Sequence, residues 1–158
     1  MSDEPAFAPE RLVAALNGAG ARYVVVGGLA VGAHGVVRAT RDLDIVCAPA
    51  AENMDRVARC LASLGAEHPV EGALTGASLA RPASFKVSTR HGDVQVLNRL
   101  AGVPSFHELQ AEQMLVRISE EAAAPVCSLA HLRMMKQAAN RPRDLADLAE
   151  LDELHGPG

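Results

Sequence analysis

Residues 23–47 carry the strongest signal in the chain, and they read YVVVGGLAVGAHGVVRATRDLDIVC. The run from Tyr23 to Val26 is short and β-branched, which predicts a buried strand. Gly27-Gly28 ends that strand, and the apolar segment from Leu29 to His34 predicts the start of a helix. A second predicted strand, Asp42 to Cys47, begins with two carboxylates two residues apart. The order strand, turn, helix, strand predicts an α/β unit.

The two carboxylates of the second strand predict a cation site. Side chains alternate across a strand, so Asp42 and Asp44 project to one face, and Leu43 and Ile45 project to the other. Two neighbouring carboxylates repel each other, and a cation between them relieves that repulsion. Hard cations that take oxygen ligands, above all Mg²⁺, suit such a pair.

The Gly27-Gly28 turn predicts an anion site beside the carboxylates. Because glycine has no Cβ, a ligand can approach the backbone closely, and N–H groups at the start of the next helix can face an anion. Each feature alone has a plainer explanation, since Gly-Gly is usually a turn and Asp-x-Asp is often a solvated strand end. Together with Arg38 and Thr40, within 25 residues, they favour a site for a nucleoside triphosphate with Mg²⁺.

The stretch resembles the signature of the DNA polymerase β-like nucleotidyltransferase superfamily: an apolar strand, Gly followed by Gly or Ser, a helix and Asp-x-Asp. It is most similar to the small bacterial branch that holds AbiEii-like abortive-infection proteins and aminoglycoside or lincosamide nucleotidyltransferases. The similarity spans about residues 20–100. The matching residues are Gly27, Gly28, Arg38, Thr40, Asp42 and Asp44. Gly28 stands where many members carry serine, so a hydroxyl contact to phosphate is missing.

The resemblance implies an α/β fold with a mixed, twisted sheet flanked by helices. It also implies an enzyme that moves a nucleoside monophosphate from a nucleoside triphosphate to a hydroxyl, with Mg²⁺ or Mn²⁺ as cofactor. The implied catalytic and metal-binding residues are Asp42, Asp44 and Asp93. The implied nucleotide-binding residues are Gly27, Gly28, Arg38, Thr40 and Lys136.

Asp93 is the third carboxylate that the resemblance implies. It begins a predicted strand, Asp93 to Leu97, which forms a hairpin with Phe85 to Thr89 and should lie beside the Asp42–Asp44 strand. Asp is disfavoured in strands, so its presence asks for a reason. It is either a strand-end turn residue after Gly92, or it holds a metal and helps to deprotonate the attacking hydroxyl.

The C-terminal segment is predicted to form two helices around a basic turn. Ser128 caps a helix from Leu129 to Ala139, and a last helix opens at Pro142 or Arg143 and ends near Leu154. The segment weakly resembles the Lys- and Asp-rich C-terminal motifs of the abortive-infection nucleotidyltransferases. The alternative is an ordinary charged helix pair.

That weaker resemblance implies specific roles for the charged residues of the turn. Lys136 would reach the triphosphate, and Arg141 or Arg143 would assist it. Asp144 would orient Lys136 or the fold.

The remaining elements are predicted from periodicity and from Gly and Pro positions. We expect helices at 9–17 and 49–64, a connection at 66–82 with at most one short strand, an irregular or helical turn at 104–110, and a strand at 114–118 that 126–127 extends.

Length and composition bound the class of protein. The 158 residues predict one domain. The resemblance implies that it is a minimal nucleotidyltransferase domain, with a core at about 9–118 and a C-terminal helical segment at about 128–154. Only four aromatic residues, one Tyr and three Phe, argue against a base-stacking single-strand binder. The net charge of −4 argues against an unspecific nucleic-acid coat, although a local basic patch could still bind RNA.

Cysteine usage and the N-terminus bear on location. The three cysteines form no Cys-x-x-Cys pair, the N-terminus is acidic without an apolar core, and no apolar run approaches the length of a membrane span. We therefore expect a cytoplasmic protein without membrane association.

The acceptor is the least defined part of the prediction. Little of the chain remains beyond the core, so we expect a second subunit in a homodimer, a partner protein or the nucleic acid itself to complete the acceptor site. Transfer to tRNA, other RNA or a partner protein in a toxin–antitoxin or phage-defence setting is favoured, and an antibiotic acceptor comes next. A non-catalytic nucleotide-binding or partner-binding domain is the third possibility, against which the Asp42, Asp44 and Asp93 set counts.

Overall fold

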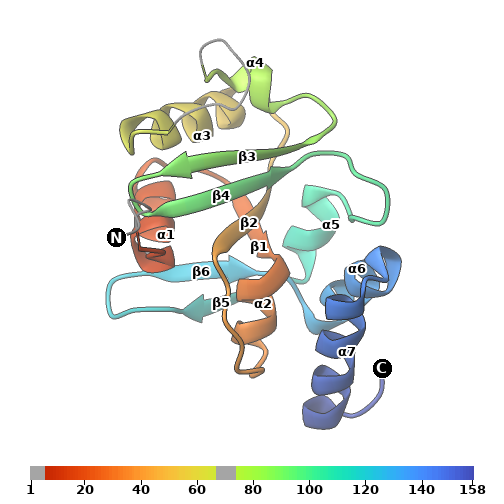
Figure 1. The fold of residues 1–158 in the computed structure, drawn as a ribbon. Helices are drawn as coiled ribbons and strands as arrows, with labels where there is room; N and C mark the ends of the chain where they lie inside the picture. Colours follow the sequence, from red (N-terminus) through yellow and green to blue (C-terminus); the bar gives the residue numbers. More distant parts are fainter. Residues whose placement is uncertain (1–5, 67–73) are drawn as a thin grey trace.

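The computed structural model describes residues 6–66 and 74–158, which fold around one mixed sheet (Figure 1). The sheet has six strands in the order β3-β4-β2-β1-β6-β5. The strands are β1 (Tyr23–Val26), β2 (Asp42–Cys47), β3 (Ser84–Thr89), β4 (Gly92–Leu97), β5 (Met114–Arg117) and β6 (Ala123–Val126). The predicted α/β class with a mixed sheet flanked by helices is confirmed.

The central strands place the carboxylates next to each other. β1 is buried at all four residues and lies between β2, which is antiparallel to it, and β6, which is parallel. β2 runs parallel to β4, and this pairing sets Asp42 beside Asp93 and Asp44 beside Gln95. The predicted hairpin and its place next to the Asp-x-Asp strand are therefore confirmed.

The helices of the described residues have the following bounds: α1 (Pro9–Gly18), α2 (Gly27–Ala33), α3 (Ala51–Ser63), α4 (Gly76–Leu79), α5 (Phe106–Ala111), α6 (Leu129–Ala139) and α7 (Pro142–His155). α1 contacts α3, β2 and β6, while α2 contacts β1, β2 and α6. In Figure 1 the blue α6–α7 pair lies to one side of the sheet. Side chains of β2 opposite the carboxylates, Leu43 and Ile45, are fully buried in the core.

Of the two short helices, α4 departs from the expected connection, whereas α5 lies where an irregular or helical turn is predicted. In the expected 66–82 connection, the structure has α4, and residues 67–73 lie outside the described residues. α4 begins with a reciprocal cap between Thr75 and Ser78, and α5 begins with one between Ser105 and Glu108. Such capping boxes satisfy orphan N–H groups at a helix start, so even these short segments become helical.

The three cysteines are free and buried. Burial raises the pKa of the Cys47 thiol to about 12 and also raises the pKa of Cys60. Burial likewise raises the pKa of Cys127 to about 12, against weaker opposing effects of a backbone hydrogen bond and Lys136. No helix in 6–66 or 74–158 is both long and apolar enough to cross a membrane.

Candidate active site

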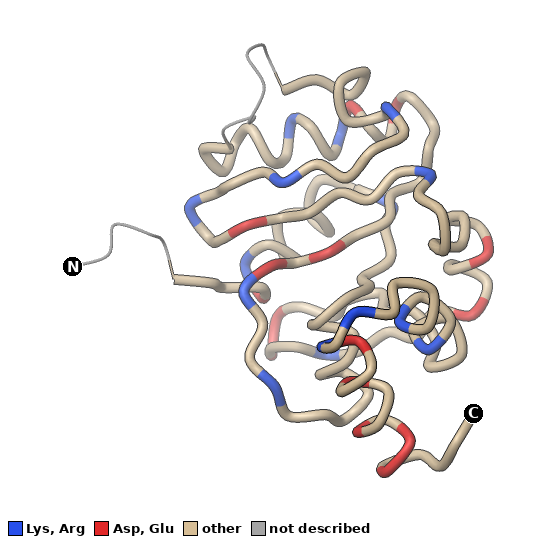
Figure 2. The backbone as a smooth tube through the Cα atoms, turned by 45° about the vertical axis from the view of Figure 1, so that its right-hand side comes forward, with Lys and Arg blue, Asp and Glu red and all other residues tan. Residues whose placement is uncertain are grey.

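A cavity of about 290 Å³ gathers most of the residues singled out by the sequence. It lies where the start of β2, the start of α2 and the α6–α7 turn meet. Its wall consists of Gly27, Gly28, Arg38, Ala39, Thr40, Arg41, Asp42, Asp44, Lys136, Arg141 and Arg143. In Figure 2, acidic positions on the neighbouring strands lie close to basic positions of the loop before β2. The cavity thus combines two carboxylates with five cationic side chains.

The three predicted carboxylates are not equally placed. Asp42 and Asp44 line the cavity, whereas Asp93 lies beside Asp42 in the sheet and outside the cavity wall. The Asp93 carboxylate is 3.6 Å from the ammonium of Lys86, an exposed residue of β3. Among the described residues, no three His, Cys, Asp or Glu side chains are gathered as a ready-made metal site.

Asp44 carries the strongest electrostatic signal of the site. Its Oδ1 atom is buried and has no hydrogen-bond partner. Burial, and secondly the charge of Asp42, raise the pKa of Asp44 from 3.8 to about 6, against weaker opposing effects of Lys136, Arg143 and Arg141. A cation bound to Asp42 and Asp44 would satisfy this oxygen and remove the repulsion, so the pair fits a hard cation such as Mg²⁺.

The glycine pair makes room for two side chains of this chain. Gly27 has a φ of +71°, and a Cβ there would lie 2.0 Å from Asp44 Oδ2. A Cβ on Gly28 would lie 2.8 Å from the hydroxyl oxygen of Thr40. The Thr40 hydroxyl therefore lies within reach of the space that a serine at position 28 would use.

A buried ion-pair network holds the other side of the cavity. Lys136 Nζ is 3.1 Å from Asp144 Oδ1 and 2.9 Å from Asp147 Oδ2. Arg38 also pairs with Asp147, and Arg141 Nε lies 2.7 Å from Asp144 Oδ2. Burial acts to raise the pKa of Asp144, but hydrogen bonds from Arg141 and Lys136 outweigh it and lower this pKa to about 2.

The network changes which cations are available to a ligand. Arg38 and Lys136, the two nucleotide-binding cations implied by the sequence, are already paired with carboxylates. Arg41 and Arg143 also line the cavity, and no carboxylate of residues 6–66 or 74–158 forms an ion pair with either. From the sequence, Arg41 is either a phosphate clamp or a surface partner of the acidic cluster, and Arg143 has only an assisting role.

Asp147 is the residue of the network to which the sequence analysis assigned no role. Its signal was its spacing from Asp144, because residues three apart on a helix lie on one face. Both carboxylates then face the same lysine. Asp144 forms an ion pair with Lys136. The role of Asp144 in orienting Lys136 for a ligand stays a prediction.

The chain is similar to known proteins in its fold, whereas its sequence matches none of them. No family model matches the sequence, and no curated protein matches it. The lincosamide antibiotic adenylyltransferase LnuA, solved with lincomycin bound, superposes with a TM-score of 0.67 at 15% identity, over 96% of this chain and 99% of that one. The chain has a nucleotidyltransferase fold.

Further solved structures share the nucleotidyltransferase fold. A nucleotidyltransferase-like protein from Thermotoga maritima matches with a TM-score of 0.59 at 16% identity, over 98% of this chain and 100% of that chain. The antibiotic-resistance factor ANT(2'')-Ia matches with a TM-score of 0.59 at 12% identity, over 91% and 80%. The superposition covers LnuA almost completely.

Proposed function

We propose that this protein is a metal-dependent nucleotidyltransferase that moves a nucleoside monophosphate from a triphosphate to a hydroxyl. The observation that carries the proposal is the buried, unpartnered Asp44 oxygen beside Asp42, in a cavity with five Arg and Lys side chains. Such a cavity suits a polyphosphate with its cation. The adenylyltransferases among the structural neighbours support this reaction class.

Asp42 and Asp44 would hold Mg²⁺, or Mn²⁺ in its place. When bound, the ion neutralises phosphate charge and lowers the pKa of the attacking hydroxyl. Arg41 and Arg143 would bind the leaving pyrophosphate, because no ion pair among the described residues occupies them. An ammonium has three donors, and Lys136 gives two to its carboxylate partners, which leaves one for a phosphate oxygen.

The phosphate path would run along the start of α2. The backbone of Gly27 and Gly28 and the hydroxyl of Thr40 line the cavity there. Thr40 would supply the hydroxyl contact that a serine at position 28 gives in many superfamily members. Arg38, held by Asp147, would add charge at the cavity wall.

Asp93 would receive the proton of the acceptor. The acceptor oxygen forms a bond to the α-phosphorus, the bond from that phosphorus to the bridging oxygen of the β-phosphate breaks, and pyrophosphate leaves. The proton of the acceptor hydroxyl passes to Asp93, which lies beside Asp42 in the sheet.

For the acceptor, the comparisons favour a small molecule. LnuA was solved with lincomycin, and ANT(2'')-Ia with an adenylylated tobramycin. Nothing in the comparisons bears on an RNA or protein acceptor, a toxin–antitoxin setting, a homodimer or a cytoplasmic location, and these stay predictions.

The proposal is tested with each α-labelled nucleoside triphosphate, with Mg²⁺, with Mn²⁺ or with chelator. The acceptors are an antibiotic panel, total tRNA and lysate protein. We expect metal-dependent nucleotide binding by calorimetry and label on one acceptor class. Equal binding with chelator would remove the metal from the reaction, and binding without any turnover would favour the non-catalytic alternative.

Asp93→Asn separates an enzyme from a nucleotide-binding domain. The variant should keep nucleotide affinity but slow single-turnover transfer by about 10²–10⁴, the usual contribution of general-base catalysis. Glu153→Gln, which removes an exposed carboxylate of α7, is the control and should leave both unchanged. Transfer by Asp93→Asn at the wild-type rate would make Asp93 a strand-end residue without a catalytic role.

A further inference from the structure

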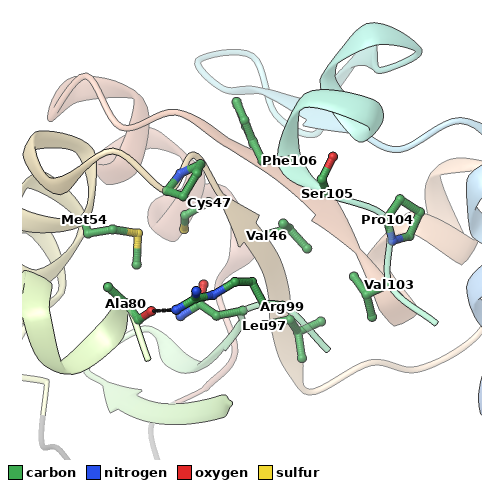
Figure 3. Close-up of a pocket in the computed structure, with 12 residues that line it drawn as sticks. Val46, Cys47, Met54, Ala80, Leu97, Arg99, Val103, Pro104, Ser105 and Phe106 are labelled. Carbon is green, nitrogen blue, oxygen red and sulfur yellow. Dashed lines mark hydrogen bonds between the residues drawn. The ribbon is translucent and has the colours of Figure 1, made fainter. Parts of the chain in front are cut away.

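A second cavity, of about 480 Å³, lies at the far ends of β2 and β4 (Figure 3). Its volume is in the range of small-molecule sites, which are about 300–1,000 Å³. The wall is largely apolar and includes Val46, Met54, Leu97, Val103, Pro104 and Phe106. Figure 3 shows these side chains around a common space, with Arg99 extending along it toward Ala80.

Part of the wall of the second cavity lies on the sheet face of the carboxylates. Alternation places Val46 on the same face as Asp42 and Asp44, and Leu97 on the same face as Asp93. At roughly 3.3 Å per residue, Val46 is about 7 Å beyond Asp44, and Leu97 is about 13 Å beyond Asp93. A small organic molecule can span these distances.

The two cavities lie at opposite ends of β2, and this arrangement indicates the side from which the acceptor attacks. The cationic cavity, with Asp42 and Asp44 in its wall, is at the start of β2, and the apolar cavity lies at the end of this strand. In phosphoryl-group chemistry the attacking and leaving oxygens are roughly in line on opposite sides of phosphorus. If pyrophosphate leaves into the cationic cavity, the attacking hydroxyl comes from the side of the apolar one.

The charge of the cavity restricts what can occupy it. No Asp or Glu is among the described residues that line it. Its ionised group is Arg99, an exposed residue whose Nη2 donates to the carbonyl oxygen of Ala80 at 3.0 Å. The Cys47 thiol in the wall stays neutral, because burial raises its pKa to about 12. A polycationic compound would find no counter-charge there.

We propose that the second cavity binds the body of the acceptor, and that this acceptor is a neutral or anionic small organic molecule with an apolar body. Its hydroxyl points along the sheet toward Asp93 and Asp44. The assignment rests on the proposed function for the reaction, while the cavity and its apolar binding are tested without turnover.

The first test uses anilinonaphthalene sulfonate, an anionic aromatic probe that fluoresces in apolar sites. Ala80→Trp fills the cavity from α4's C-terminal end without touching the carboxylates or the cationic cavity. Ala77→Trp is the matched control, because Ala77 is exposed on α4 and lies outside the cavity wall. We expect Ala80→Trp to weaken probe binding about tenfold or more through lost apolar contact, and Ala77→Trp to leave it unchanged.

The second test measures transfer to chloramphenicol as a neutral aryl diol, to kanamycin as a polycation and to tRNA as a polyanion. Chloramphenicol should compete with the probe, and transfer to it should fall with probe binding in Ala80→Trp, while triphosphate affinity is retained. Circular dichroism checks folding, and Val103→Trp replaces Ala80→Trp if that variant unfolds.

Two results would overturn the assignment of the cavity. One is probe binding that both cavity-filling variants leave intact. The other is transfer to kanamycin or tRNA alone that neither variant affects. A wild-type protein that binds the probe in the cavity but no triphosphate would instead contradict the proposed function, so the two failures are distinguishable.

Discussion

Residues 23–47 and residues 129–155 contribute to the same cavity, but they treat buried charge in opposite ways. The first region leaves the Asp44 carboxylate without a hydrogen bond at one oxygen. The second pairs Lys136 with two carboxylates, each of which also binds an arginine. An unpaired buried charge costs stability and is ready for a ligand, whereas a paired one holds the fold. We therefore infer that Asp44 binds a ligand, whereas the network around Lys136 holds the fold in position.

Removing the lysine from the buried ion-pair network should have the largest effect on stability. Lys136→Met would leave Asp144 and Asp147 buried with less compensation, and we expect a loss of about 3–5 kcal/mol in the free energy of unfolding. Urea unfolding at pH 7 measures it. The control Lys86→Met removes an exposed lysine near Asp93 and should cost no more than about 1 kcal/mol. Equal midpoints for both variants would show that the network is not structural.

Removing the charge of the unpaired Asp44 carboxylate should change the free energy of unfolding by a smaller amount and in the opposite direction. Folded protein keeps the Asp44 proton up to about pH 6, whereas the unfolded chain releases it near pH 4. Ionisation therefore destabilises the fold, and this contribution grows as pH rises from about 4 to 6 and persists above. Asp44→Asn should gain up to about 2–3 kcal/mol at pH 7 and lose that part of the pH dependence.

The same Asp44→Asn variant should lose metal-dependent triphosphate binding, because Asp44 would hold the metal. Thermal unfolding between pH 3 and pH 8, with and without Mg²⁺ and triphosphate, measures both effects. At pH 3 the variant and the wild type should be equally stable with respect to this group. A variant that melts below wild type at pH 7 would make Asp44 a structural residue.

Within the cationic cavity, an unpaired arginine can be compared with the paired residues Arg38 and Lys136. Arg143→Ala should weaken triphosphate binding by about 1.5–3 kcal/mol, the value of hydrogen bonds to charged groups, with little change in stability. Arg56→Ala, on an exposed position of α3, should change neither. Calorimetry with triphosphate and Mg²⁺ measures the affinity, and unchanged binding by Arg143→Ala would return the role to Arg38 and Lys136.

The smallest expected effect concerns Gly28 and Thr40. Gly28→Ser brings a Cβ close to the Thr40 hydroxyl, which can rotate away, so the cost should stay below about 1 kcal/mol. Adding Thr40→Ala should remove the contact with the hydroxyl but not the 3.2 Å contact with the Cβ of residue 40, and it leaves one hydroxyl at the phosphate path. A double-mutant cycle measures the coupling, and additive effects would show that the two side chains do not share this space.

The sequence predicted what local rules control. β1 and β2 have the predicted bounds, because a β-branched run and alternation define a strand without reference to distant parts. Ser128 accepts from the His131 N–H at the predicted helix start. The neighbouring positions of Asp42 and Asp93 follow from one hairpin and one strand pairing.

The sequence did not predict which charges would meet. Arg38 and Asp147 are 109 positions apart, and their pairing depends on where α7 lies against the loop before β2. Such packing is a tertiary property that no local pattern encodes. The same limit left the apolar cavity unpredicted, because its wall comes from the ends of β2 and β4, from α3 and from the loop before α5.

The three buried cysteines make the protein a convenient host for site-specific labels. Maleimide reagents need a thiolate that solvent can reach, and burial with raised pKa withholds it at Cys47, Cys60 and Cys127. A cysteine introduced at an exposed position such as Ser88, beside Asp93 in the sheet, would be the preferred site of reaction. A fluorophore there would report acceptor and nucleotide arrival in real time, with the native thiols left in place.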